Sequence, residues 1–582
     1  MTTITIDRNI TIPLRDGTLT SADLYRPAGN GALPVLLQRT PYNKQASGGY
    51  YQTFAMRAAE AGFAVVIQDV RGRYNSGGQF HPFVQEQPDG FDTCEWIVNQ
   101  AWCNGRIGMF GGSYVGLTQW QAALAGAPGL EAIAPHVTAS DYHDGWTYQG
   151  GAFNLFFNYS WATGLTFETA GRRRAIDPLD PGFLDNLERV DNLDRFISLS
   201  PHDHDKTLLD LGPWYQEWID HPALDAYWDH LNIAGKYGQL DIASFNSGGW
   251  YDVFLGGTIA NYVGMKWEGG GERAKQGSRL LIGPWSHATA SLGGAAGDYF
   301  PGALGAPDAV DMHGQWIRFF DRWLRDHDAT GFDAEPPVSI FVMGENRWRS
   351  ESAWPLERAV ATEFFLGSGG RANTAGGDGA LLRDLPGDQH STPDHYLSDP
   401  RDPVPTAGGQ LCCPVHWSPS GAFDQKRVES RQDVLVYTSA PFDVPTEITG
   451  PVTVVLYAAS SAVDTDLTAK LVDACPCGCA RNLTDGIVRA RYRASQRTET
   501  LLTPNEVERY EIDLWATSVV LQPGHALRLE IASSNFPRFD RNMQTGGLQA
   551  TTHLDDSVVA MQTVLHDADH PSRLVVQIVP AE

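Results

Sequence analysis

The fold of this chain is decided by residues 106–116, which read Arg106-Ile107-Gly108-Met109-Phe110-Gly111-Gly112-Ser113-Tyr114-Val115-Gly116. The apolar start of this stretch predicts a strand over 106–110, and a helical run follows from Leu117 to Leu124. The glycines permit a sharp strand-to-helix turn, which would lift the Ser113 hydroxyl above the sheet. Backbone N–H groups at the start of the helix would lie beside this hydroxyl, where they could stabilise an oxyanion.

The spacing of the glycines departs from the G-x-S-x-G pattern, since Gly116 lies three residues after Ser113 rather than two. A serine between a strand and a helix can also be a plain structural turn. The motif alone therefore leaves a structural and a catalytic role open, and other segments have to decide between them.

Two later segments supply candidate partners for a nucleophilic serine. Asp252 follows a strand-like run that begins at Leu240, and His287 follows the apolar run Arg279–Pro284. Both lie in loops directly after a strand, where catalytic groups collect in open parallel sheets. Alone, Asp252 could cap its loop and His287 could be a hydrogen-bonded loop histidine. Together with Ser113 they follow the chain order Ser, Asp, His of alpha/beta-hydrolases, which predicts a Ser-His-Asp triad.

The expected roles follow from the chemistry of these side chains. A serine hydroxyl is a poor nucleophile without a base, and His287 would take its proton during attack on a carbonyl carbon. Asp252 would hold the imidazole in the correct tautomer and stabilise its charged form. This mechanism needs no metal ion and no organic cofactor, and we expect none.

Several short motifs occur in a characteristic order along the chain: Arg39-Thr40-Pro41-Tyr42, Asp69–Arg73, Ala101–Gly105, the Ser113 elbow, Gly249–Asp252, Gly283–His287, Phe341–Gly344, Trp348-Arg349 and Ser533–Pro537. In these motifs the chain resembles the cocaine esterase and X-prolyl dipeptidyl peptidase superfamily of alpha/beta-hydrolases, over nearly its whole length. The pattern is nearest to bacterial cocaine esterases. The elbow of that family is G-x-S-Y-x-G, which accounts for the position of Gly116.

The resemblance also implies two oxyanion donors. In cocaine esterase-like enzymes, a tyrosine hydroxyl after an early strand acts together with the backbone N–H that follows the serine. Here these groups are the hydroxyl of Tyr42 and the backbone N–H of Tyr114. From the residues alone, Tyr42 would be interpreted as a loop tyrosine packed at a surface.

The pattern of elements divides the chain into an alpha/beta-hydrolase core, an inserted cap and a C-terminal domain. Residues 1–141 and 240–350 alternate strands with helices, as a doubly covered sheet requires. Residues 142–239 are helical in character and rich in aromatic residues, which predicts a helical cap over the site. Residues 351–582 contain short strands separated by Gly-rich turns, which predicts an all-β sandwich. The family resemblance implies that this sandwich is a jelly roll.

The resemblance bears on the substrate as well. In alpha-amino-acid ester hydrolase relatives, acidic residues after the triad aspartate hold the substrate ammonium, whereas this chain has Val253, Phe254 and Leu255 there. An unpaired buried ammonium is costly, which argues against an amino-acid ester. Phe254, Trp146 and Trp161 resemble the aromatic lining of a cocaine esterase acyl pocket. Alternatively, the two tryptophans are simply core residues of the cap.

Two enzymatic functions and one non-enzymatic function are considered. The first is a carboxylesterase acting on a hydrophobic acyl group, aromatic or branched. The second is an amide-bond hydrolase of the same family, either an X-prolyl dipeptidyl peptidase or a beta-lactam acylase, for which Asp141, Asp144 or Glu168 could hold an amine if they turned inward. A non-catalytic binding protein is disfavoured, because the complete triad set is present.

Composition limits the partners. The formal net charge of -26 argues against nucleic acid and against an anionic membrane. No apolar run reaches the roughly 18 residues of a membrane span. The first residues lack the basic and apolar regions of a signal peptide, which predicts a cytoplasmic location. The expected partner is a small-molecule ester or amide, and the family suggests a homodimer.

The seven cysteines imply no secreted disulfide framework. Cys412 and Cys413 are adjacent, and Cys475, Cys477 and Cys479 form a C-x-C-x-C cluster between two strand-like runs. Without nearby histidines in the sequence, these residues are interpreted as hairpin thiols, with a zinc or copper site as the alternative. A regulatory disulfide has no support in the sequence.

Overall fold

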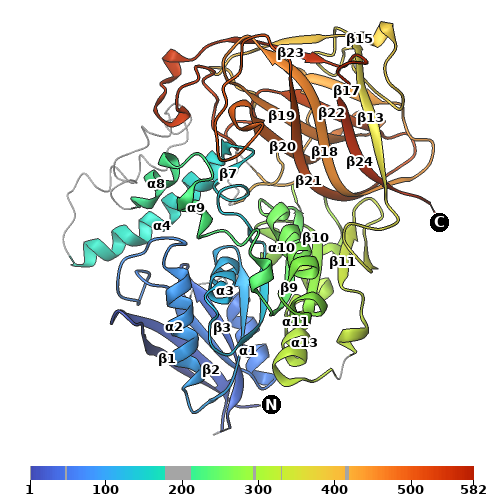
Figure 1. The fold of residues 1–582 in the computed structure, drawn as a ribbon. Helices are drawn as coiled ribbons and strands as arrows, with labels where there is room; N and C mark the ends of the chain where they lie inside the picture. Colours follow the sequence, from blue (N-terminus) through green and yellow to red (C-terminus); the bar gives the residue numbers. More distant parts are fainter. Residues whose placement is uncertain are drawn as a thin grey trace.

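The computed structural model describes residues 2–29, 31–45, 49–176, 212–292, 296–328, 331–412 and 419–581. Within these residues the chain forms a ten-stranded sheet from its first 351 residues and a twelve-stranded sheet from residue 360 onward (Figure 1). Helices cover the first sheet, whereas the second domain is built almost entirely from strands. The predicted α/β core followed by an all-β domain is confirmed.

The centre of the ten-stranded sheet is parallel, from β4 through β3, β5, β6, β9 and β10 to β11. Antiparallel strands complete its two edges. β4, β9 and β10 are buried at every position, as expected for strands covered on both faces. In sheet order the strands are β1 (Ile4–Pro13), β2 (Leu19–Pro27), β4 (Ala64–Asp69), β3 (Leu33–Thr40), β5 (Cys103–Gly112), β6 (Leu130–His136), β9 (Ala243–Tyr251), β10 (Ser278–Ser286), β11 (Val338–Val342) and β12 (Arg347–Glu351).

Alternate residues of the strands face two separate hydrophobic cores. On β3, Leu36 packs with the residues of α1 and α13, whereas Val35 and Leu37 pack with those of α2 and α3. The last helix of this domain, α13, buries Trp316, Phe319, Phe320 and Leu324 against the sheet. The helices around this sheet are α1 (Tyr50–Glu60), α2 (Glu86–Val98), α3 (Tyr114–Leu124), α10 (Leu255–Glu268), α11 (Glu272–Gly277), α12 (Thr289–Leu292) and α13 (Met312–Arg325).

The chain between β6 and β9 contacts both domains. Its described elements are β7 (Tyr148–Gln149), β8 (Ala152–Phe153), α4 (Leu155–Ile176), α8 (Trp214–Asp220) and α9 (Ala226–Asp229), and residues 177–211 of the predicted cap lie outside the described residues. Toward the first sheet, Gln121 donates to the Leu231 carbonyl at 2.5 Å. Toward the second domain, Phe156 donates its N–H to the Pro537 carbonyl at 3.1 Å.

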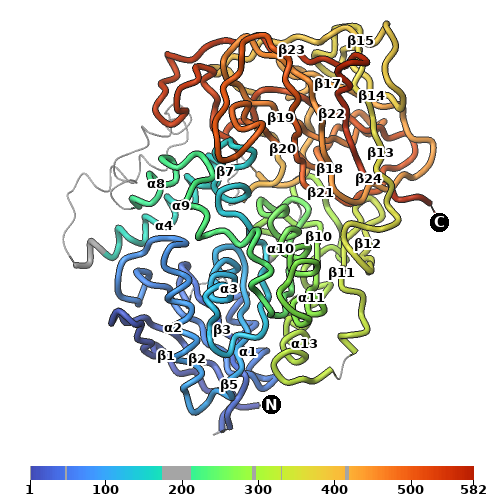
Figure 2. Tube along the Cα trace, in the orientation of Figure 1, coloured from blue at the N-terminus to red at the C-terminus, as the bar shows by residue number. Residues whose placement is uncertain are grey.

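The twelve-stranded sheet makes up the second domain (Figure 2). β21 pairs with β18, which also pairs with β23 and β24. Buried apolar side chains of these strands form one continuous cluster, which also includes Trp250, Leu280 and Ile340 of the first sheet. The strands are β13 (Val360–Gly369), β14 (Ala380–Leu382), β15 (Ser391–Thr392), β16 (Asp394–Ser398), β17 (Leu435–Ser439), β18 (Thr446–Ser460), β19 (Asp466–Ala474), β20 (Ala480–Arg489), β21 (Glu508–Leu521), β22 (Ala526–Ala532), β23 (Ala560–Leu565) and β24 (Arg573–Val579).

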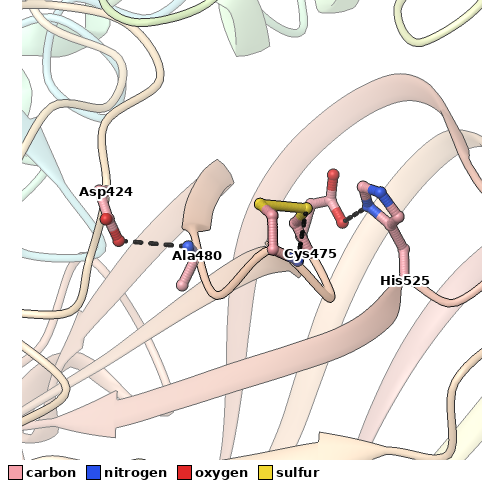
Figure 3. The surroundings of a disulfide bond; sticks show 6 residues. Asp424, Cys475, Ala480 and His525 are labelled. Carbon is pink, nitrogen blue, oxygen red and sulfur yellow. Dashed lines mark hydrogen bonds and ion pairs between the residues drawn. A yellow bond between two sulfur atoms is a disulfide. The ribbon is translucent and has the colours of Figure 1, made fainter.

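The C-x-C-x-C cluster forms the turn between β19 and β20. Cys475 and Cys477 are joined by a disulfide (Figure 3), so two of the three residues differ from the predicted hairpin thiols, and Cys479 is a free thiol. The nearby His525 is bound to Asp473 at 2.6 Å. In the described part of the chain, no group of three or more His, Cys, Asp or Glu side chains is placed to hold a metal ion. Cys413 lies outside the described residues.

A buried ion-pair network joins the second domain to the inserted region. The Arg489 guanidinium on β20 binds Asp466 at 2.9 Å and Asp540 at 2.7 Å. Asp540 in turn accepts the N–H of Phe153 from β8 at 2.9 Å. Burial raises the pKa of Asp540, and the charge of Arg489 opposes this shift. The network therefore helps to hold the inserted region against the β domain.

We predict that Arg489→Met lowers the free energy of unfolding of the β domain by about 3–5 kcal/mol, because two buried carboxylates lose their cationic partner. The measurement is urea denaturation followed by circular dichroism. The matched control is Arg371→Met, whose side chain is 82% exposed in its ion pair with Asp378 and whose loss should cost less than about 1 kcal/mol. Equal effects of the two variants would contradict the assignment.

Candidate active site

Ser113 lies in the turn between β5 and α3, with φ 61° and ψ -127°. This conformation is strained for a residue with a Cβ atom and is typical of functional turns. Hydrogen bonds hold the turn in place. The Ser113 N–H donates to the His136 carbonyl at 2.9 Å, and the Ser113 carbonyl accepts the N–H of Gly116 at 2.8 Å. The end of β6 therefore fixes the backbone of the predicted nucleophile.

The glycines of the elbow are required by close packing. A Cβ atom at Gly116 would lie 2.6 Å from Cβ of Thr138. A Cβ atom at Gly111 would lie 2.4 Å from Cγ1 of Val115, and the φ of Gly111 is +126°. The glycine three residues after Ser113 thus serves the contact between α3 and the segment after β6, which explains the departure from G-x-S-x-G.

Asp252 and His287 are brought together at the end of the sheet where the parallel strands β9 and β10 end. Their strands, β9 and β10, are parallel neighbours, and Tyr251 lies opposite Ser286 in the register. Oδ1 of Asp252 lies 2.7 Å from Nδ1 of His287. The Asp252 side chain is fully buried, whereas the His287 side chain is 12% exposed. A buried carboxylate bound to Nδ1 leaves Nε2 as the nitrogen that can exchange a proton with a substrate or nucleophile.

The hydroxyl of Tyr42, on the loop after β3, lies at the elbow. It accepts a hydrogen bond from Nε1 of Trp161 at 2.9 Å. Burial raises the pKa of Tyr42, and hydrogen bonds with Trp161, with the Ser113 side chain and with the Tyr114 backbone oppose this shift. The structure thus brings Tyr42, Ser113 and the Tyr114 N–H to one point. Because Trp161 already donates to the Tyr42 oxygen, the phenol proton is free to be donated to an oxyanion.

The three aromatic residues predicted to line a pocket are in contact with one another. Trp146 stacks on Phe254 with ring centroids 4.4 Å apart, and it packs against Trp161 in a T-shaped arrangement with centroids 6.1 Å apart. Phe254 also contacts the His287 ring at 5.3 Å. All three aromatic side chains are buried. A continuous row of rings therefore runs from His287 to the indole that binds Tyr42.

The Tyr114 ring stacks on Trp161 with centroids 5.9 Å apart, and its hydroxyl is bound on the other side by Glu86 and Phe83. This hydroxyl donates to Oε1 of Glu86 at 2.9 Å and accepts the N–H of Phe83 at 3.0 Å. Glu86 is buried against Arg39, with an N–O distance of 2.7 Å. Only the backbone N–H of Tyr114 is thus available as an oxyanion donor, whereas its side chain anchors the start of α3.

Arg73 and Asp69 hold the loop that carries Tyr42, and their roles were missed by the sequence reasoning. Nε of Arg73 donates to the Pro41 carbonyl at 3.0 Å, and Arg73 pairs with Glu168 of α4 at 2.8 Å. Asp69 forms a fully buried ion pair with Lys44 at 3.0 Å. The Asp69–Arg73 motif was visible in the sequence as part of the family pattern, but nothing in it indicated which loop the two side chains would support.

His136 is a second residue that the sequence reasoning missed. Burial and the nearby charge of His287 lower its pKa to about 3. Its Nδ1 lies 2.9 Å from Oγ of Ser247. His136 is therefore neutral at any working pH and adds no positive charge beside His287. The only signal was its place at the end of a predicted strand.

The acidic residues considered as an amine anchor are engaged elsewhere. Oδ1 of Asp141 accepts the N–H groups of His143 and Asp144, at 2.8 and 2.9 Å. Asp144 is exposed and accepts the N–H of Gly150 at 2.8 Å. Glu168 is paired with Arg73. Asp141 and Asp144 thus accept backbone N–H groups, and Glu168 is paired with an arginine.

None of the described helices combines the length and the apolar character that are needed to cross a membrane.

Comparisons with known proteins agree on a family. Residues 16–289 match the family described as X-Pro dipeptidyl-peptidase (S15 family), and residues 330–575 match the X-Pro dipeptidyl-peptidase C-terminal non-catalytic domain. The chain is 39% identical to cocaine esterase of Rhodococcus sp. (strain MB1 Bresler) over 584 residues, covering 98% of each chain. The resemblance inferred from the motifs is confirmed.

Two solved structures have the same fold. An alpha-amino acid ester hydrolase matches with a TM-score of 0.81 and 26% identity, covering 99% of this chain and 96% of the other. An aminopeptidase from a marine sediment Thaumarchaeota archaeon matches with a TM-score of 0.83 and 23% identity, covering 99% and 97%. The second likeness shows the fold alone.

The position of Tyr42 gives a direct prediction. Tyr42→Phe removes one of the two oxyanion donors, and we expect kcat to fall about 10²–10³-fold, the usual effect of losing such a donor. The measurement is steady-state turnover of an ester substrate. The control is Tyr262→Phe on α10. This substitution removes a buried hydroxyl that has no hydrogen-bond partner among the described residues. A Tyr42→Phe variant as active as this control would contradict the assignment.

Proposed function

The chain belongs to the X-Pro dipeptidyl-peptidase (S15) family and is a hydrolase of the esterase type, and we propose that it cleaves carboxylic esters with a hydrophobic acyl group through an acyl-enzyme on Ser113. The observation that carries this proposal is that two sets of residues lie at the end of the sheet where its parallel strands end. There Asp252 binds His287 at 2.7 Å, and the buried Tyr42 hydroxyl meets Ser113 and the Tyr114 backbone.

Acylation starts with proton transfer. Nε2 of His287 takes the proton of the Ser113 hydroxyl while Oγ attacks the ester carbonyl carbon. The carbonyl oxygen becomes an oxyanion, which accepts hydrogen bonds from the Tyr42 hydroxyl and the Tyr114 N–H. When the tetrahedral intermediate collapses, the C–O bond to the alcohol breaks and His287 returns the proton to the leaving oxygen. Asp252 keeps the imidazole oriented and stabilises its charged form.

Deacylation repeats these steps with water as the nucleophile. His287 takes a proton from water, the hydroxide attacks the acyl carbon, and the bond to Ser113 breaks as its Oγ regains the proton. The products are a carboxylic acid and the enzyme in its starting state. Every step uses side chains of this chain and one water molecule.

The acyl group is proposed to lie against Phe254, Trp146 and Trp161. These buried rings contact one another in a row between His287 and Tyr42. Apolar rings favour an aromatic or branched acyl group over a charged one. The ion pair of Glu168 with Arg73 supports the same preference, because this carboxylate is already paired with a cation.

The amide-bond hydrolases of the family stay as the alternative function. The folds of the aminopeptidase and of the alpha-amino acid ester hydrolase are shared by this chain. Peptidase activity on a free N-terminus would need a carboxylate at the pocket. Residues 253–255 supply none, which favours the ester.

We further propose the finer organisation predicted from the sequence: a core of residues 1–141 and 240–350, a helical cap at 142–239 and a jelly roll at 351–582. The helices α4, α8 and α9 and the contacts of Trp161 with Tyr42 support the cap. The pairing of twelve strands and the continuous apolar cluster of their side chains support the jelly roll. The cytoplasmic location, the homodimer and the lack of a cofactor stay predictions.

Substrate class is tested by parallel turnover of phenyl benzoate, p-nitrophenyl acetate and Gly-Pro-p-nitroanilide, with Ser113→Ala as the blank. We expect the benzoyl ester to give the highest kcat/KM, the acetyl ester to follow, and the anilide to match the blank. Fast release of p-nitroaniline would overturn the esterase assignment in favour of a peptidase. Turnover by the Ser113→Ala variant equal to that of the wild type would overturn the mechanism.

A further inference from the structure

A cleft of about 350 Å³ opens at the end of the ten-stranded sheet where its parallel strands begin, opposite the end that carries Ser113. The first residues of β9, β10 and β11 contribute Phe245, Arg279 and Ser339 to its walls. Asp252 and His287 follow the last residues of β9 and β10, at the other end of these strands. Because β10 has nine residues, the two ends are separated by roughly 25 Å. The cleft is thus distinct from the candidate active site.

Arg279 lines this cleft and is nine-tenths buried. Its Nη1 donates to the carbonyls of Gln276 at 3.0 Å and Ser278 at 3.2 Å. Its Nε is buried and has no hydrogen-bond partner among the described residues, and no described carboxylate forms an ion pair with it. The edge formed by Nε and Nη2 is the one that binds a carboxylate with two parallel hydrogen bonds. Here that edge is left without a protein partner.

The carboxylates near Arg279 offset its charge only in part, and none of the described ones forms an ion pair with it. Arg318 lies close by, since the Cζ atoms of both arginines approach the Phe332 ring, at 4.9 and 5.5 Å from its centroid. The nearest acids are each engaged by another arginine: Glu335 pairs with Arg318, and Asp333 pairs with Arg322. Burial lowers the pKa of Arg279, as expected for a cation that lacks a counter-ion. The cleft therefore holds excess positive charge in a chain whose formal net charge is -26.

The rest of the lining is mixed in character. Phe332 offers a ring face beside the two guanidinium groups, and Val310, Pro336 and Pro337 supply apolar surface. The remaining polar residues of the lining are Gln315, Glu335, Ser339 and Ser350. The volume lies in the range of small-ligand pockets. The Arg279 guanidinium, with which no described carboxylate forms an ion pair, matches a ligand with one negative charge, and the apolar part of the lining matches a ligand with an organic body. Both features differ from what an inorganic dianion would need.

We propose that this cleft is a binding site for a small organic monocarboxylate. Its two oxygen atoms accept hydrogen bonds from Nε and Nη2 of Arg279, and its apolar body lies against Phe332 and Pro336. The ion pair would satisfy a buried guanidinium that is otherwise costly, which is the source of the affinity.

The proposal is tested by isothermal titration of the full-length protein with benzoate, with benzamide as the neutral probe of the same shape and with inorganic phosphate as the dianion. We expect saturable binding of benzoate, at least tenfold weaker binding of both other probes, and at least tenfold weaker benzoate binding by Arg279→Gln. Arg401→Gln, an exposed arginine of the β domain, should bind benzoate like the wild type.

Three results would overturn the proposal: no saturable benzoate binding to the wild type, equal affinity of the wild type and Arg279→Gln, or benzamide or phosphate binding as tightly as benzoate. If Arg279→Gln does not fold, crystals of the wild type soaked with 4-bromobenzoate replace it. A bromine anomalous peak beside Phe332 would support the site, and peaks only elsewhere would overturn it.

Discussion

The strained backbone of Ser113 is the constraint on which the active site depends. A φ of 61° at a residue with a Cβ atom costs on the order of 1–3 kcal/mol, and it persists only where the surroundings determine it. Here the Ser113 N–H donates to the carbonyls of His136 and Val137. The missing side chain of Gly116 lets Thr138 approach α3. The sheet and the helix thus fix the direction of one hydroxyl, and the other groups are arranged around it.

The inserted region completes the site that the sheet begins. Arg73 holds the Tyr42 loop through a hydrogen bond to the Pro41 carbonyl, and Trp161 of α4 donates a hydrogen bond to the Tyr42 hydroxyl. The β domain in turn holds the insertion through the hydrogen bond from the Phe153 N–H to Asp540. Asp540 belongs to the ion-pair network of Arg489. The β domain contributes no predicted catalytic group, and this chain of contacts connects it to Tyr42, the predicted oxyanion donor.

The residues that follow the ends of the parallel strands could be predicted from the sequence, because each comes after an apolar strand and lies in a Gly-rich or polar turn. Ser113, Asp252 and His287 were predicted in this way, and the structure places Asp252 beside His287. The bond between Tyr42 and Trp161 could not be predicted from the residues, since it joins positions 119 apart and depends on how α4 packs against the core. The roles of Arg73 and His136 depend in the same way on tertiary contacts. The cysteines of the C-x-C-x-C cluster were predicted to be hairpin thiols, so the disulfide between Cys475 and Cys477 was not predicted.

The central claim is that Ser113, Tyr42 and the Tyr114 N–H act on one carbonyl group. It is tested most directly by a crystal structure of the enzyme with a benzeneboronic acid, which forms a tetrahedral adduct on a nucleophilic serine. The account predicts a bond from boron to Oγ of Ser113, with one boronate oxygen about 2.7–3.1 Å from both the Tyr42 hydroxyl and the Tyr114 nitrogen. Boron bonded to another side chain, or an adduct whose oxygen atoms avoid both donors, would contradict it.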